Sequence, residues 1–133
     1  MALDISYSAQ SHITTIIMTG LLTRAEYRRM LPHLKSIAAD TGPLHLVIVE
    51  RDFEGWAPPE LEGKALSALG SDNFLHRVAV VASEQWRVRL MNTVISSSFV
   101  PCCSFNLDQH AEAERWIKGR LAFGLPDRQR AAS

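Results

Sequence analysis

Apolar residues follow two periodicities along this chain, and the order in which the periodicities alternate predicts an α/β fold. Residues 3–7 and 12–19 alternate with polar residues or are rich in β-branched residues, as expected for a pair of strands. Apolar runs at 44–50, 78–82 and 99–105 are typical of further strands, and the first two read as strands covered on both faces. Residues at helical spacing fill the stretches between them. The predicted order is β-β-α-β-α-β-α-β-α, a mixed and mostly parallel sheet of four or five strands with about four crossover helices.

Short polar and proline motifs predict where the helices begin. Thr23 and Glu26 have the spacing of a capping box, in which each side chain satisfies a free backbone N–H at a helix start. The proline pair at 58–59 suits the first turn of a second helix. Ser83 and Asp108 are expected to cap the third and fourth helices.

Length, charge and cysteine content are those of one globular domain. A chain of 133 residues can bury about two-thirds of its unfolded surface, so we expect a single domain over 1–123 and a flexible tail at 124–133. Fourteen basic and fourteen acidic residues cancel, which argues against binding to nucleic acid or to an anionic membrane. No segment approaches the ~20 apolar residues of a membrane span. Without a signal-peptide pattern, and with Cys102 and Cys103 expected as free thiols, the protein is expected to be cytoplasmic.

The stretch at 52–56 is the most informative part of the sequence, because it directly follows the predicted strand at 44–50. It combines two carboxylates, two aromatic rings and a glycine within a predicted loop at 51–59. The loops that follow parallel strands gather at one edge of a sheet, where α/β proteins usually bind ligands. The candidate ligand- or partner-binding residues at this edge are Asp52, Phe53, Glu54, Trp56, Ser83, Trp86 and Phe105.

The residues alone leave several roles open for this edge. The rings could plug the end of the core, or rings and carboxylates together could bind a protein partner or a small amphipathic ligand. Asp52 and Glu54 could also form an acid–base pair. Other catalytic signatures fail, because the serine run at 96–98 lacks a nucleophile-elbow frame and the five histidines lack metal-ligand spacing. We therefore expect no enzyme, no metal and no cofactor.

A family resemblance rests on the element order and on several short motifs. They are the stretch at 52–56, the strand Arg77-Val78-Ala79-Val80-Val81, Trp86 three residues after Ser83, and Phe105-Asn106-Leu107-Asp108 followed by Ala111, Ala113 and Trp116. Over about residues 12–121 the chain resembles the SpoIIAA-like proteins, small bacterial relatives of the STAS domain that share a fold group with CRAL-TRIO lipid-binding domains. The resemblance implies an α/β sheet, a cytoplasmic setting and usually no established activity.

One departure from the regulatory STAS proteins bears on mechanism. Those proteins carry a phosphorylatable Ser or Thr at the start of the second helix, whereas this chain has no hydroxyl residue between Thr41 and Ser67. Carboxylates already stand where a phosphate would add negative charge, so a kinase-driven switch is not carried over. We predict a non-enzymatic regulatory or scaffold module that binds a protein partner or forms a homodimer, with its first hairpin and the Pro101 strand as free sheet edges. The alternative is a carrier or sensor of a small amphipathic ligand.

Overall fold

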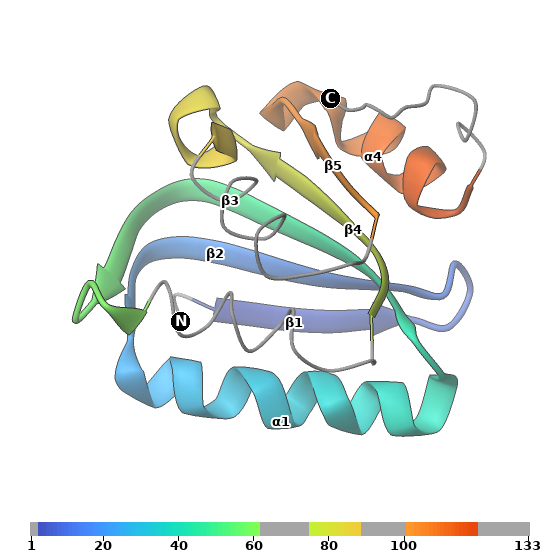
Figure 1. Ribbon diagram of the computed structural model, residues 1–133, viewed down its shortest axis with the longest axis horizontal. Coiled ribbons are helices and arrows are strands. Elements are labelled where there is room, and N and C mark those ends of the chain that lie inside the picture. Colours follow the sequence, from blue (N-terminus) through green and yellow to red (C-terminus); the bar gives the residue numbers. More distant parts are fainter. Residues whose placement is uncertain (1–2, 62–74, 89–100, 120–133) are drawn as a thin grey trace.

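The computed structural model describes residues 3–61, 75–88 and 101–119, which form a five-stranded sheet in the order β1-β2-β3-β4-β5 (Figure 1). The strands are β1 Leu3–Ser8, β2 Ile13–Thr23, β3 Leu44–Ala57, β4 Leu75–Ala82 and β5 Cys102–Phe105. The helices are α1 Arg24–Thr41, a 3-10 turn at Leu107–Gln109 and α4 His110–Ile117, with further helical turns at 84–88 and beginning at Leu61. β1 pairs antiparallel with β2 and all other pairs are parallel, so the predicted mixed sheet is confirmed.

Helices cover both faces of the sheet, with α1 along one face and α4 packed on the other (Figure 1). One hydrophobic core lies between the sheet and each of these helices, and alternate residues of β3 contribute to the two cores. Leu46 and Ile48 are buried on the α1 side, and Val47 and Val49 are buried on the α4 side. This alternation explains why the apolar run of β3 is continuous.

The strands β2 and β3 are both longer than the sequence predicted. β2 continues to Thr23 and β3 continues to Ala57, so the predicted loop at 51–59 is wrong over residues 51–57. Register shifts on both sides of Gly20, whose φ is 63°, allow the pairing of the two strands to continue beyond their regular portion.

Two predicted helix starts are also displaced. The proline pair at 58–59 lies in a turn ahead of the second helix, in which the Leu61 N–H donates to the Pro58 carbonyl at 3.0 Å. Asn106, rather than Asp108, caps the last helical segment, because the Gln109 side chain accepts the Asn106 N–H at 2.9 Å. The expectations for the remainder of the second helix, for the serine run at 96–98 and for the tail at 124–133 lie outside the described residues.

Glu26 joins the first two strands to α1. The predicted capping box is present, and α1 ends at Gly42 as a C-cap with φ of 89°. The Glu26 carboxylate is buried and accepts the backbone N–H of Leu3 at 3.1 Å and that of Thr23 at 3.4 Å. One side chain therefore satisfies donors at the start of β1 and at the junction of β2 with α1.

Two side chains from the sheet hold the carboxyl end of α4. Arg77 Nη1 donates to the Trp116 carbonyl at 2.8 Å, and its guanidinium lies 5.2 Å from the centre of the Trp116 ring. His45 Nδ1 lies 3.1 Å from the Ile117 carbonyl. Donors at the end of a helix satisfy carbonyls that have no partner within the helix, and a cation there also complements the helix dipole. Among the described residues, no helix is long and apolar enough to cross a membrane.

Replacing Glu26 should destabilise the fold in a graded manner. We expect Glu26→Ala to lower the free energy of unfolding by about 1–3 kcal/mol, because it removes the acceptor of a buried N–H at Leu3 and of a partly buried one at Thr23. Glu26→Gln should lose less, since its amide oxygen can still accept one of these bonds. Urea unfolding measures both, with the exposed Asp40→Ala at the other end of α1 as control, expected within about 0.5 kcal/mol of wild type. Equal stability of Glu26→Ala and the control would contradict this role.

Candidate functional site

The stretch at 52–56 lies in the last part of β3 and pairs with the end of β2. Phe53 is opposite Gly20, and Trp56 is opposite Leu22. The pairing of β3 with β4 ends earlier, at Glu50. Residues 52–56 therefore belong to a two-stranded ribbon that extends beyond the rest of the sheet, which Figure 1 shows curling towards the start of α1.

Two unusual backbone conformations determine which side chains of this ribbon are buried and which are exposed. Asp52 has φ of 55° and Gly55 has φ of 122°, and both angles interrupt the regular alternation of a strand. Phe53 and Trp56 consequently both face the core, with 6% and 5% of their surfaces exposed. Asp52 and Glu54 are exposed to solvent. A side chain at Gly55 would be strained at that φ.

The buried rings form an aromatic cluster with Trp86 from the helical turn after β4. The Phe53 ring centre lies 5.0 Å from that of Trp86 and 6.1 Å from that of Trp56, both in edge-type geometry. A Cβ on Gly55 would lie 3.9 Å from the tip of the Trp86 ring. The cluster packs into the core on the α1 side, so these rings close the end of the hydrophobic core.

The expectation that Phe105 joins these residues is wrong. Phe105 pairs with Val81 and belongs to the core on the α4 side, where its ring lies 6.2 Å from that of Trp116. Alternation along a strand sends neighbouring residues to opposite faces, and the register of β5 places Phe105 on the face away from α1. Ser83 lies exposed at the end of β4, where its carbonyl accepts the Arg87 N–H at 2.9 Å. This backbone bond is consistent with the helix start predicted there.

One polar residue near this edge, Glu50, was missed by the sequence analysis, and one candidate residue, Trp56, has a buried polar atom. Glu50 is 2% exposed and lies between Met18 and Ala82 in the register of the sheet. A carboxylate that ends an apolar run was the available signal. The Trp56 indole Nε1 is also buried and has no hydrogen-bond acceptor among the described residues.

Titratable groups elsewhere show two clear shifts. Burial, and then the charge of Cys103, raises the pKa of Cys102 to about 12, so its thiol stays protonated at neutral pH. Partial burial, followed by the charges of His45 and Arg77, lowers the pKa of His76. Within the described ranges, no group of three or more His, Cys, Asp or Glu side chains gathers as metal ligands do.

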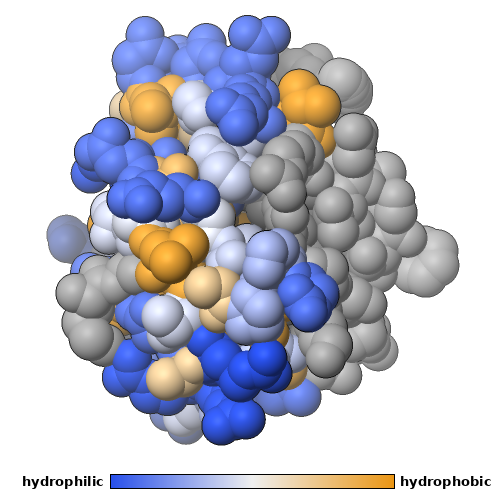
Figure 2. Space-filling model, turned by 90° about the vertical axis from the view of Figure 1, so that its left-hand side faces the viewer, coloured by the Kyte–Doolittle hydropathy of each residue, from blue (hydrophilic) through white to orange (hydrophobic). Residues whose placement is uncertain are grey.

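The surface at the end of β3 is mainly polar. Figure 2 faces the end of the molecule at which β3 finishes, and apolar side chains there form separate spots between hydrophilic ones. The large apolar side chains most exposed among the described residues are Leu21, Val88 and Leu107, at 50%, 55% and 39%. Leu21 lies opposite Gly55 in the β2–β3 pairing. We call the exposed set Leu21, Asp52 and Glu54 the β2–β3 tip.

Comparison with known proteins supports the fold and decides the family. The family model described as SpoIIAA-like matches residues 13–118. The chain belongs to the SpoIIAA-like family. This SpoIIAA-like chain is also similar in structure to an uncharacterized protein of the DUF3478 family from Shewanella loihica PV-4, which has a SpoIIAA-like fold. The TM-score is 0.61 at 21% identity, covering 87% of this chain and 92% of that one, and a likeness at this identity shows the fold alone. Among curated proteins, none matches the sequence.

Truncation in the ring cluster should destabilise the fold, whereas truncation of an exposed carboxylate should leave its stability nearly unchanged. We expect Trp56→Ala to lower the free energy of unfolding by about 3–5 kcal/mol, because it opens a cavity at the end of the core. Glu54→Ala, two residues away and exposed, should change it by no more than about 0.5 kcal/mol. Denaturant unfolding followed by circular dichroism measures both. Comparable losses of unfolding free energy in the two variants would contradict the placement of Trp56 in the core and Glu54 on the surface.

Proposed function

We propose that this SpoIIAA-like domain is a non-enzymatic regulatory or scaffold module that binds another protein, or a second copy of itself, through the β2–β3 tip. The observation that carries the proposal is that the aromatic side chains at the end of β3 are buried while the acidic ones are exposed. The rings of Phe53 and Trp56 are buried, while Leu21 on β2 and Asp52 and Glu54 on the paired end of β3 are exposed.

The chemistry of the tip suits recognition of a protein. Leu21 is half exposed and lies opposite Gly55, which follows the exposed Glu54 directly and the exposed Asp52 at three residues. Protein interfaces commonly surround an apolar anchor with polar groups that stay hydrated or pair with the partner. Strand pairing and the rings beneath hold the ribbon in place, so binding would cost little ordering of the tip.

The exposure of the carboxylates argues against catalysis at this edge. Acid–base catalysts usually stand in sites where burial and neighbouring charges adjust their proton affinity. Asp52 and Glu54 instead face solvent. We therefore propose that they contribute charge to recognition, with no chemical step.

One observation favours the second candidate, a carrier or sensor of a small amphipathic ligand. The buried Trp56 Nε1 has no acceptor among the described residues, and a buried donor without a partner costs free energy. A ligand with an apolar body and one acceptor atom would satisfy it. Native mass spectrometry of gently purified protein should then show added mass that Trp56→Phe removes, and a mass equal to the bare chain after exposure to a lipid extract would exclude this candidate.

Partner binding should depend on the tip and be independent of a matched site elsewhere. We expect the double variant Leu21→Ser, Glu54→Lys to weaken capture of a specific partner, or self-association, by more than about tenfold, because it removes an anchor and reverses a charge. Cross-linking with mass spectrometry identifies captured partners, and analytical ultracentrifugation measures self-association.

The control for this experiment is the double variant Leu107→Ser, Asp108→Lys, which makes comparable chemical changes at exposed residues that follow β5. Thermal unfolding verifies that both variants are folded. If the folded tip variant keeps every partner and the self-association of wild type, the tip is not the binding surface.

A further inference from the structure

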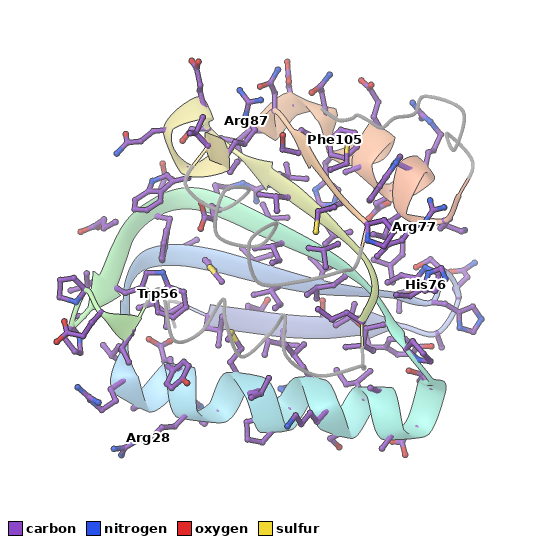
Figure 3. The ribbon with its side chains drawn as sticks, viewed as in Figure 1. Arg28, Trp56, His76, Arg77, Arg87 and Phe105 are labelled. Carbon is purple, nitrogen blue, oxygen red and sulfur yellow. The ribbon has the colours of Figure 1, made fainter. Side chains whose placement is uncertain are left out.

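The starts of the parallel strands, at the opposite end of the sheet from Trp56, bring two histidines together. Figure 3 shows Trp56 at one end and His76 with Arg77 at the other. Leu44 pairs with Leu75, but His45 pairs with Arg77, so His76 is an extra residue in β4. Such an irregularity lets two residues of one strand oppose one residue of its neighbour and redirects their side chains. The His45 and His76 ring centres lie 4.7 Å apart, with the ring planes inclined by 37°.

We propose that His45 and His76 form a two-histidine site for a divalent transition-metal ion, with Cu²⁺ preferred over Zn²⁺. Neutral imidazole is a good ligand for both ions, and Cu²⁺ binds such nitrogen donors more tightly. This site lies away from the β2–β3 tip and does not depend on the function proposed for the tip.

The separation of the rings matches what one shared ion requires. An ion about 2.0–2.1 Å from a ring nitrogen lies about 3.2 Å from the ring centre. Two imidazoles bound to one ion at angles between square-planar and tetrahedral then have centres about 4.5–5.2 Å apart. The observed 4.7 Å falls within this interval.

The hydrogen bond of His45 prepares it for this role. A carbonyl oxygen can only accept, so the contact of Nδ1 with the Ile117 carbonyl places the proton on Nδ1. In the neutral ring Nε2 then carries the lone pair that a metal needs. Histidine ligands of metals usually donate their other N–H to a carbonyl or carboxylate in this way, which fixes the ring orientation.

The positive charge of Arg77, next to His76 in β4, is bound to α4. Arg77 is adjacent to His76 and would repel a bound cation, but its Nη1 donates to the Trp116 carbonyl and its guanidinium lies against the Trp116 ring. The positive charge and the two neutral ligands favour an exchangeable ion over a permanent structural one. Two protein ligands also leave coordination positions for water or for a group supplied by another molecule.

The test uses the full chain without an affinity tag, titrated with Cu²⁺ alone and followed by calorimetry and electron paramagnetic resonance. We expect one reversibly bound Cu²⁺ per chain, with a spectrum showing two coordinated nitrogens, and weaker binding of Zn²⁺. His76→Gln should lower Cu²⁺ affinity by more than about tenfold, since even loss of a group that supports a metal ligand costs that much. His76 is exposed, so this variant should fold normally.

His45→Gln provides a second test that keeps a donor for the Ile117 carbonyl, and it should cause the same loss of Cu²⁺ affinity. His33→Gln is the matched control, because His33 is exposed on α1, and it should bind like wild type. The proposal is overturned if wild type binds Cu²⁺ no more tightly than His76→Gln does. It is equally overturned if His33→Gln loses as much affinity as the two site variants.

Discussion

The parallel pairing of β2 with β3 continues beyond the pairing of β3 with β4, and the architecture of the candidate site depends on this extension. β3 leaves β4 at Glu50 but stays paired with β2 as far as Ala57, opposite Thr23. Thr23 is also the cap of α1, and the buried Glu26 carboxylate ties this junction to the start of β1. The same backbone pairing therefore positions the ribbon and the start of the helix that covers the core.

The extended ribbon separates the aromatic residues of one short stretch, which face the core, from its acidic residues, which face solvent. The positive φ angles of Asp52 and Gly55 turn Phe53 and Trp56 towards the core, while the carboxylates remain in water. An edge closed from within by packed rings offers a partner a rigid surface, which is why we favour protein recognition there. Strand register has a comparable effect at the other end of the sheet, where an extra residue in β4 sets one histidine beside another.

The sequence predicted the features that depend on local chemistry. The prediction failed for features that depend on how the strands pair. The capping pair Thr23 and Glu26 and the continuous run of β3 were recognised, because spacing and burial pattern express them directly. The ribbon was read as a loop because its buried rings, Phe53 and Trp56, are three residues apart and break the period of two that identifies a strand. The face on which Phe105 lies follows from the pairing of β5, which no local pattern shows.

Amide exchange and cross-strand contacts measured by NMR test most directly whether residues 53–57 form a paired strand. If the ribbon exists, the amides of this stretch that bond to β2 exchange slowly, and backbone nuclear Overhauser effects join Leu22 to Trp56. The amide of the exposed Glu60, in the turn beyond β3, serves as the fast-exchanging reference. Uniformly fast exchange over 53–57, without any contact between Leu22 and Trp56, would contradict the account of this edge.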